Sequence, residues 1–417
     1  MITCIVIKTS IMYHNRGSHF DFIILLLWNF VTKREKFMSS LTLGVVGSSF
    51  KENELRVPIH PEQLDWIDLS VRKRMFFEVG YGERFQISDD WINDRTGGLM
   101  QRNEIFEHCD VVMLIKPDPK DIPFIHPGKT LWGWLHCIED VWITNAAINK
   151  NLTMIAWEAM HKWNRKNEFQ YHIFHKNNEI AGYAGVFHAL QLRGIDGHYG
   201  TPRRVMIIGS GSVARGALQA FKGLGFKDIH IYNRPSKTFI APQSYEATYH
   251  QLEMDENGRL MAIHADRSRN LFIEEIAQSD IILNGIRQDF KQPIMFMSHE
   301  EVSRLKRSAL IIDIARDEGM GFPFSKPTSF INPIFTVGEA WYYAVDHTSS
   351  YLWNIASWEI SISLLPYLSS ISRGAPYWES DETIRRAIQI QNGRIVDPRI
   401  LSFQNRDAEY PHIINPG

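Results

Sequence analysis

Short apolar runs alternate with longer segments of helical periodicity along most of the chain. Continuous apolar runs bounded by turn residues are typical of strands buried on both faces of a parallel sheet. They predict a first set of strands at 41–47, 75–78, 109–115, 130–136 and 153–156. A second set follows at 205–208, 229–232, 281–283 and 310–314. Alternating strands and helices predict an α/β fold with two Rossmann-like domains and a cleft between them.

The order of these segments also predicts how the domains divide. A helix is expected over 178–193, a stretch without proline, and it leads into the second strand set. The region beyond Tyr342 is rich in Trp and Tyr and lacks the strand spacing of the second set. We therefore expect a discontinuous catalytic domain, residues 41–177 and 346–417, around a dinucleotide-binding domain, residues 178–345. The length of 417 residues agrees with two cores.

The first forty residues differ from the rest. Residues 20–31 are almost entirely apolar, and Lys33, Arg34 and Lys36 follow. The run is shorter than the about 20 residues that a membrane-spanning helix needs, and no small-residue cleavage pattern follows it. We interpret residues 1–40 as an extension outside the fold, with Met38 as a plausible start, and expect residues 1–37 to be dispensable. A short membrane anchor remains the alternative.

Charge and cysteine content narrow the class of protein. Lys plus Arg number 45 against 47 Asp plus Glu, a net charge of −2, and no block of like charge occurs. This balance gives no attraction to nucleic acid and no reason for stable membrane association. The three cysteines fit neither a disulfide framework nor a zinc site, so we expect a cytoplasmic protein without a metal. The sequence leaves open whether the protein forms a homo-oligomer.

A dinucleotide fingerprint follows the strand 205–208. The sequence Gly209-Ser210-Gly211-Ser212-Val213-Ala214 has the form GxGxxA and opens a helix that we expect to run to about Leu224. The first glycine permits the tight turn, the second lets the backbone approach a pyrophosphate, and the small Ala214 lets helix and strand pack closely. The helix N-terminus then presents free N–H groups to the phosphates. A glycine-rich turn without nucleotide is the plainer alternative.

The end of the next strand indicates which dinucleotide is bound. An NAD enzyme usually has an acidic residue there, which binds the ribose hydroxyls. Here the position holds Asn233-Arg234. Because Arg234 can pair with a 2′-phosphate, the sequence favours NADPH as the cofactor and leaves NADH as the alternative.

Two candidate proton-handling groups end strands of the first domain. Lys116 ends the strand 109–115, and His136 ends the strand 130–136. Ligands bind at the carboxyl edge of open α/β sheets, where desolvation lowers a lysine pKa and suits it to proton transfer. Histidine titrates near neutrality. The plain alternatives are a solvated lysine and a packed core histidine.

Other polar groups are candidates for substrate or nicotinamide contacts. Arg56, in Asn-Glu-Leu-Arg-Val-Pro, can bind a carboxylate through two parallel bonds, or form a surface ion pair with Glu54 or Glu52. Asp313 and Asp317 follow a Rossmann strand in a glycine-containing loop. Asp346-His347 is either an acid–base pair or a helix cap with its neighbour.

Together these motifs resemble the superfamily of alanine dehydrogenase, pyridine nucleotide transhydrogenase and saccharopine dehydrogenase, over residues from Leu41 to about His412. The resemblance implies that Arg56 holds a substrate carboxylate, that Lys116 and His136 serve substrate binding and acid–base chemistry, and that Asp317 lies beside the nicotinamide. Four segments look most similar to sequences called N5-(carboxyethyl)ornithine synthase, namely Trp157–Met160, Gly197–Gly200, Tyr342–Trp353 and Ile400–Arg406.

The resemblance implies an oxidoreductase of amino-acid metabolism that acts on CH–NH bonds. We expect NADPH-dependent reductive condensation of a 2-oxo acid such as pyruvate with the side-chain amine of an amino acid, ornithine or lysine. An amino-acid dehydrogenase of the alanine or saccharopine type is the first alternative. A catalytically silent nucleotide-binding protein is the second, and the joint presence of Lys116, His136 and Arg56 argues against it.

Overall fold

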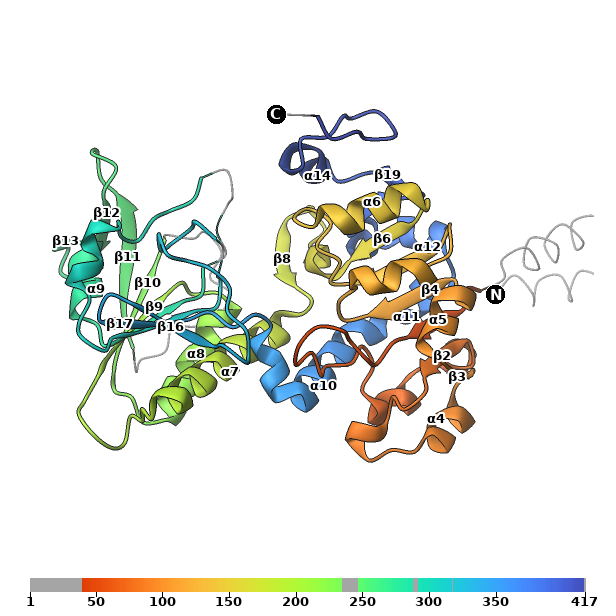
Figure 1. Ribbon diagram of the computed structural model, residues 1–417, viewed down its shortest axis with the longest axis horizontal. Helices are drawn as coiled ribbons and strands as arrows, with labels where there is room; N and C mark the ends of the chain where they lie inside the picture. Colours follow the sequence, from red (N-terminus) through yellow and green to blue (C-terminus); the bar gives the residue numbers. More distant parts are fainter. Residues whose placement is uncertain (1–39, 235–246, 287, 289–291, 317, 416–417) are drawn as a thin grey trace, which may run out of the picture.

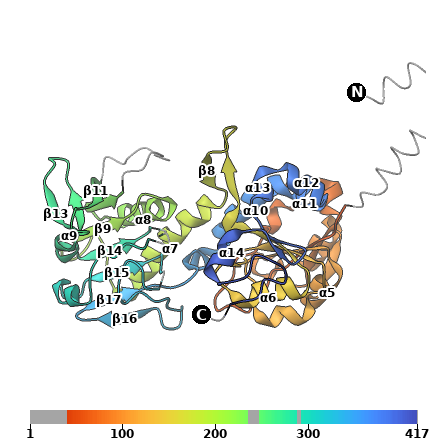
Figure 2. The same cartoon turned by 90° about the horizontal axis from the view of Figure 1, so that it is seen from above.

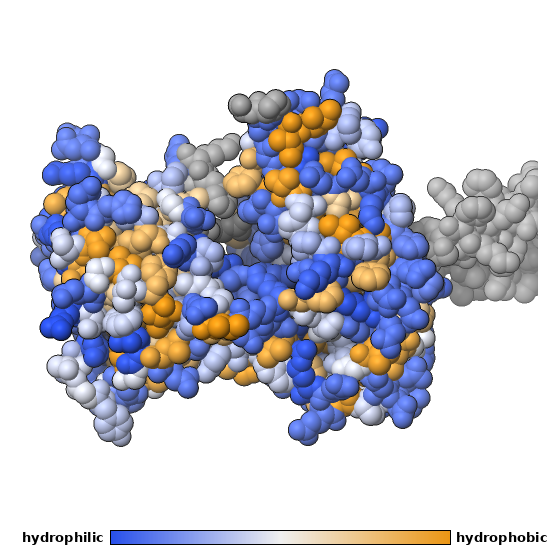
Figure 3. All heavy atoms as spheres, viewed as in Figure 1, coloured by the Kyte–Doolittle hydropathy of each residue, from blue (hydrophilic) through white to orange (hydrophobic). Residues whose placement is uncertain are grey.

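The computed structural model has two lobes, each built on a mostly parallel β-sheet (Figure 1). It describes residues 40–234, 247–286, 288, 292–316 and 318–415. The expected extension, residues 1–40, lies almost wholly outside this range. In Figure 3 the surface is hollowed between the lobes, on the side where α14 (Pro398–Phe403) lies in Figure 1. The expected α/β architecture with two Rossmann-like domains is confirmed.

The first sheet has eight strands, in the order β19-β18-β6-β5-β4-β1-β2-β3. The six strands from β6 to β3 run parallel, and the C-terminal β18 pairs antiparallel with β6. The strand order reverses between β4 and β1, which is where open α/β sheets form a ligand-binding crevice. The strands are β1 Leu43–Val45, β2 Met75–Glu78, β3 Gly98–Met100, β4 Val111–Leu114, β5 Thr130–Gly133, β6 Thr153–Ala156, β18 Ile388–Gln391 and β19 Arg394–Ile395.

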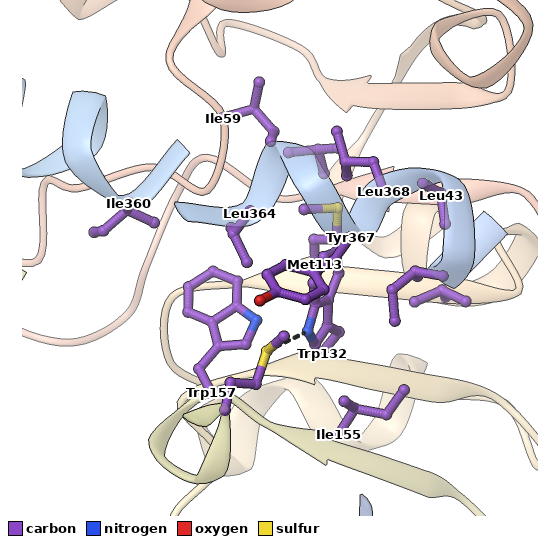
Figure 4. Packing of buried hydrophobic residues seen from close by; sticks show 14 of the residues in the cluster. Leu43, Ile59, Met113, Trp132, Ile155, Trp157, Ile360, Leu364, Tyr367 and Leu368 are labelled. Atoms are coloured by element: carbon purple, nitrogen blue, oxygen red, sulfur yellow. Dashed lines mark hydrogen bonds between the residues drawn. The ribbon is translucent and has the colours of Figure 1, made fainter. Parts of the chain in front are cut away.

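Helices and a hairpin complete this lobe. Figure 2 shows the hairpin of β7 and β8 projecting from its body. One face of the sheet buries an aromatic cluster, in which the Trp132 indole donates to Met160 Sδ at 3.3 Å near Trp157 and Tyr367 (Figure 4). The elements are η1 Pro61–Trp66, α3 Leu69–Arg72, η2 Glu83–Phe85, α4 Asp89–Arg95, α5 Arg102–His108, η3 Pro119–Phe124, α6 Val141–Asn149, η4 Trp157–Ala159, β7 His161–Trp163, β8 Phe169–His172, α10 Trp353–Leu364, η7 Leu365–Tyr367, α11 Leu368–Ser372, α12 Ala375–Ser380, α13 Glu382–Arg385 and α14.

The second sheet has nine strands, in the order β13-β12-β11-β10-β9-β14-β15-β17-β16. The six strands from β11 to β17 are parallel, and the order reverses between β9 and β14. The elements are α7 His175–Arg193, β9 Arg204–Ile208, α8 Ser212–Gly223, β10 Asp228–Asn233, β11 Thr248–Met254, β12 Leu260–Ile263, β13 Arg269–Leu271, α9 Phe272–Gln278, β14 Ile281–Asn284, η5 Glu300–Arg304, β15 Leu310–Asp313, β16 Ile334–Val337, β17 Ala340–Tyr343 and η6 Thr348–Leu352.

The predicted strands are present: four (41–47, 109–115, 130–136 and 310–314) are one to three residues shorter at an end than expected, three (205–208, 229–232 and 281–283) are one residue longer at an end, and 75–78 and 153–156 agree. The antiparallel strands β12, β13, β16, β18 and β19, the parallel strands β3, β11 and β17, and the β7–β8 hairpin were not predicted. Strands such as β8 and β13 are exposed or only partly buried, so they lack the continuous apolar runs that marked the central strands. The pairing of β18 with β6 brings the C-terminal region back to the first sheet. The exact division at 177/178 and 345/346 stays a proposal. None of the described helices is both long and apolar enough to cross a membrane.

Helices α7 and α8 cross at a contact that only glycine permits. A Cβ atom on Gly216 would lie 1.8 Å from the Glu179 carbonyl oxygen, and one on Gly182 would lie 2.0 Å from that of Val213. We expect Gly216→Ala to lower the free energy of unfolding by about 1–3 kcal/mol, because the two backbones must move apart. Gly223→Ala is the matched control, since Gly223 lies in the same helix and a Cβ added there would meet no atom within 4 Å. Denaturant unfolding that gives equal stability for both variants would contradict this expectation.

Candidate active site

The predicted catalytic groups lie at the carboxyl edge of the first sheet. Lys116 follows β4, His136 follows β5, and Arg56 lies in the segment after β1. These three strands are neighbours in the order β5-β4-β1 and span the switch point between β4 and β1. Parallel strands end at one edge, so the sheet brings together groups that are distant in sequence.

Lys116 is nearly buried and faces a single carboxylate. Its side chain is 13% exposed, and Nζ lies 3.4 Å from Asp346 Oδ2. Burial, opposed by Asp346 and Glu54 and assisted by Lys51 and Arg316, lowers the Lys116 pKa to about 7. A lysine with this pKa is present in both protonation states near neutrality, as a proton-transfer group requires.

Asp346 joins cations from both sheets. Its carboxylate forms ion pairs with Lys51, from the segment after β1, and with Arg316, from the loop after β15. His347 Nδ1 lies 3.3 Å from Oδ2. Burial raises the Asp346 pKa, but the charges of Arg316, Lys116 and Lys51 and a hydrogen bond with His347 together hold it well below its usual range. Asp346 is therefore an anion that neutralises a cluster of cations where the two lobes meet.

His136 has an unusual backbone conformation, with φ at +51°. Its backbone N–H donates to Glu158 Oε1 at 2.7 Å, and that of Leu135 donates to Oε2 at 3.3 Å. Burial lowers the pKa of His136 to about 3, and the charge of Lys116 adds to this effect. The imidazole is therefore neutral at physiological pH, and among its charged neighbours Asp346 favours its protonation. Burial also raises the Glu158 pKa, to about 7.

Arg56 is buried and makes an internal ion pair, not the surface pair that was the plain alternative. Nε and Nη2 donate to the Glu54 carboxylate at 2.7 and 2.5 Å. Nη1 donates to Ser349 Oγ at 2.8 Å and to Asn177 Oδ1 at 3.2 Å. Glu54 thus occupies the Nε–Nη2 edge, and Ser349 and Asn177 accept from Nη1, so a substrate carboxylate at the Nη1–Nη2 edge would displace one of these two contacts.

The fingerprint turn lies between β9 and α8, as its form requires. Gly209 has φ at +112°, and a Cβ there would lie 3.0 Å from Ile286. At Gly211, the residue that precedes α8, an added Cβ would meet no atom within 4 Å. Ser210 and Gly211 are exposed, whereas Ser212 and Val213 are partly buried. The turn therefore leaves open space at the N-terminus of a twelve-residue helix, which fits a bound pyrophosphate.

Asn233 and Arg234 lie beside this turn. The Asn233 amide donates to Ser210 Oγ at 3.2 Å, and Arg234 is exposed. Asn233 ends β10, the strand next to β9, so the pair occupies the place where a ribose would be bound. Asp317 lies outside the described residues.

A continuous set of contacts connects the turn with the charged cluster. Gly209 approaches Gly285, which follows β14. Asn284 donates to Asp313 Oδ1 at 2.9 Å, and Asp313 Oδ1 accepts from the Arg316 backbone N–H at 2.8 Å. Arg316 then pairs with Asp346. Asp313 thus supports the loop that carries Arg316. Among the described residues, no three His, Cys, Asp or Glu side chains are arranged to hold a metal ion.

Comparison with known proteins identifies the family. The family model described as "Alanine dehydrogenase/PNT, N-terminal domain" matches residues 45–181, and the model for the C-terminal domain matches residues 189–398. The chain belongs to the alanine dehydrogenase/PNT family. As a member of this family, it is an oxidoreductase.

Curated relatives fall into two groups. The N(5)-(carboxyethyl)ornithine synthase of Clostridium botulinum is 27% identical over 74% of this chain and 88% of that protein. The protein of the same name from Lactococcus lactis subsp. lactis strain IL1403 is 25% identical over 77% and 94%. Alanine dehydrogenase of Mycolicibacterium smegmatis is 21% identical over 88% and 96%.

Solved structures show the same fold. An L-alanine dehydrogenase superposes with a TM-score of 0.68 at 17% identity, covering 87% of this chain and 99% of that one. The transhydrogenase from Sinorhizobium meliloti superposes with a TM-score of 0.61 at 16% identity, covering 86% and 99%.

Four residues of the candidate active site were not selected as site residues from the sequence. Lys51, Arg316 and Glu158 were not considered as site residues, and Asp346 was considered only as an acid–base partner or helix cap. Each follows a parallel strand within a few residues, except that Lys51 lies six residues beyond β1. Their position after strand ends was the available signal.

Proposed function

We propose that the protein catalyses NADPH-dependent reductive condensation of a 2-oxo acid, pyruvate, with the side-chain amine of an amino acid, ornithine or lysine. The observation that carries the proposal is the pairing of a lysine of pKa about 7 with a neutral histidine at one sheet edge, in contact with the nucleotide-binding lobe through Asp346. The relatives named N(5)-(carboxyethyl)ornithine synthase support this reaction.

The reaction needs two proton transfers. The substrate amine must lose a proton before its lone pair attacks the keto carbon, and we assign the transient acceptance of that proton to the neutral ring of His136, whose protonation Asp346 favours. The resulting carbinolamine loses its hydroxyl as water, and the Lys116 ammonium donates the proton to this oxygen. That step gives water and a protonated imine, which a hydride from bound NADPH would reduce to the secondary amine.

Other residues orient the reactants. The Nη1–Nη2 edge of Arg56 binds the oxo-acid carboxylate, displacing the contact with Ser349 or Asn177. The turn at Gly209–Val213 holds the pyrophosphate on the N-terminus of α8. Asp317 is placed beside the nicotinamide by the family resemblance alone.

The reaction is tested by incubating the protein with NADPH, pyruvate and a panel of amino acids, while following NADPH loss and product mass. The expected result is NADPH oxidation that depends on ornithine or lysine, with a product heavier than the amine by the reduced pyruvyl group. Free ammonia supporting equal oxidation, with alanine as product, would instead identify an alanine dehydrogenase activity. The relatives of that name make it the second candidate.

We predict a preference for NADPH over NADH that depends on Arg234. Because hydrogen bonds to a charged group contribute about 1.5–3 kcal/mol, Arg234→Asp should lower the ratio of kcat/KM values for NADPH and NADH by about 10- to 100-fold. Arg307→Asp is the control, since Arg307 is exposed just before β15, at the opposite edge of the sheet. Equal use of both dinucleotides by the unmodified protein would refute the preference.

A further inference from the structure

The loop that begins at His136 is held through its backbone. We call residues 135–140 the histidine loop. The N–H groups of Leu135 and His136 donate to Glu158, and the His136 carbonyl accepts from the N–H groups of Glu139 at 3.2 Å and Asp140 at 2.9 Å. The carbonyls of Cys137 and Ile138 come next in the chain. Both are buried positions, so their oxygens need partners.

A residue from the far end of the chain supplies those partners. Gln404, the residue that follows α14, donates through Nε2 to the Cys137 carbonyl at 2.8 Å and to the Ile138 carbonyl at 3.1 Å. Thr144 also donates to the Cys137 carbonyl at 2.8 Å. Gln404 is buried, with 6% of its surface exposed. The C-terminal segment 397–415 therefore covers the histidine loop from outside the sheet.

Arg406 fixes the orientation of the Gln404 amide. Its Nε donates to Gln404 Oε1 at 2.6 Å. Because a guanidinium only donates hydrogen bonds, the amide atom that faces it must be the oxygen. The amide nitrogen must then point at the loop carbonyls, which only accept. Asparagine and glutamine amides often leave this choice open, whereas here Arg406 determines it.

Arg406 is itself a buried cation without a carboxylate partner among the described residues. Its Nη1 donates to the His412 carbonyl at 3.0 Å and its Nη2 to Asn145 Oδ1 at 2.7 Å. Burial lowers the pKa of Arg406. Burying a charge against neutral acceptors alone is costly, so a packed apolar side chain would serve a purely structural role at least as well.

We propose that Gln404, oriented by Arg406, is a positioning residue for His136, so that the C-terminal segment 397–415 is part of the active site. The proposal rests on the proposed function, in which His136 moves a proton. A non-glycine residue at positive φ is strained and keeps that conformation only when its surroundings impose it. Glu158 holds the loop before His136, and Gln404 holds it after.

The decisive variant is Gln404→Glu. Glutamate keeps the size of the side chain and still accepts from Arg406, but its carboxylate has no N–H to donate to the two carbonyls. Gln404→Leu removes both interactions and serves as the second variant. The matched control is Gln63→Leu, since Gln63 is a fully buried glutamine whose amide donates to Trp358 outside the loop.

Condensation activity is the first measurement. We expect both Gln404 variants to lower kcat by about 10- to 100-fold, the scale of a misplaced catalytic group, with KM for NADPH unchanged. Gln63→Leu should keep kcat within about twofold of the unmodified protein. A normal kcat in both Gln404 variants, or an equal loss in Gln63→Leu, would overturn the proposal.

A second measurement needs no substrate and separates this proposal from the proposed function. The His136 ring is followed by NMR across about pH 5–8, the range in which an ordinary histidine titrates, with His136→Gln to assign its signal. Burial and the nearby cations Lys116, Arg316 and Lys51 oppose protonation of the ring, and Asp346 favours it. The unmodified ring should not titrate in this range.

In the Gln404 variants a loosened loop admits water, so the pKa of His136 should rise into that range. If the His136 signal stays unchanged in both variants, Gln404 does not position His136, whatever reaction the enzyme catalyses. If the signal changes but no condensation is found in the unmodified protein, the positioning role stands and the proposed reaction fails.

Discussion

Lys116→Ala is expected to lower the kcat of condensation by about 10²–10⁴-fold, the usual contribution of one general acid or base. The Lys116 ammonium is the proposed donor to the departing hydroxyl, and its pKa lies at about 7. Condensation by the unmodified protein should therefore fall as pH rises through about 7. The reverse oxidation, which needs the neutral amine, should rise over the same range. In Lys116→Ala, the pH dependence near 7 should disappear from both the condensation rate and the oxidation rate. Initial rates measured across pH in the two directions test this.

His136→Ala should cost a similar factor, and the double variant should cost less than the product of the two single effects. Residues that act in one step are not additive when removed. Binding of NADPH should survive in all three variants, because the phosphates are held by the other sheet. Fluorescence titration of NADPH and thermal unfolding provide the controls. Near-normal turnover in Lys116→Ala would end the proposed mechanism.

Asp346→Asn should affect both stability and the pH profile. The substitution leaves Lys51, Lys116 and Arg316 without their shared anion. We expect a loss of about 3 kcal/mol in the free energy of unfolding, the lower end for a broken buried pair, because Lys51 and Arg316 are about one third exposed. Because Asp346 raises the Lys116 pKa, its removal should also shift the pH at which the condensation rate falls to a lower value.

Asp280→Asn provides the matched control for this substitution. Asp280 pairs with Lys306 at 3.0 Å, just before β14 and remote from the carboxyl edge of the sheet. Its removal should leave the pH profile unchanged. An Asp346→Asn protein with normal stability and an unshifted pH profile would show that Asp346 does not neutralise the cluster.

The sequence by itself was sufficient for the central strands and for the groups that end them. Buried parallel strands are continuous apolar runs whose ends can be located to within about three residues, which was enough to select Lys116 and His136 without a structure. The Gly209 fingerprint was equally local, because strand, turn and helix follow one another within one short segment. The family resemblance rested on such local segments as well.

Only the tertiary structure decided which distant groups share the site. Asp346 meets Lys51, Lys116 and Arg316 because four strand ends from two sheets come together, and no spacing along the chain records that. Gln404 reaches the carbonyl of Cys137 across 267 positions because β18 returns to β6. The sequence indicated that the Arg56 guanidinium could bind a carboxylate through two parallel bonds. It did not indicate that Glu54 already occupies one edge of the guanidinium in a buried ion pair. Periodicity reports which face of an element is buried, whereas ion pairs and backbone contacts depend on which elements the chain later places beside it.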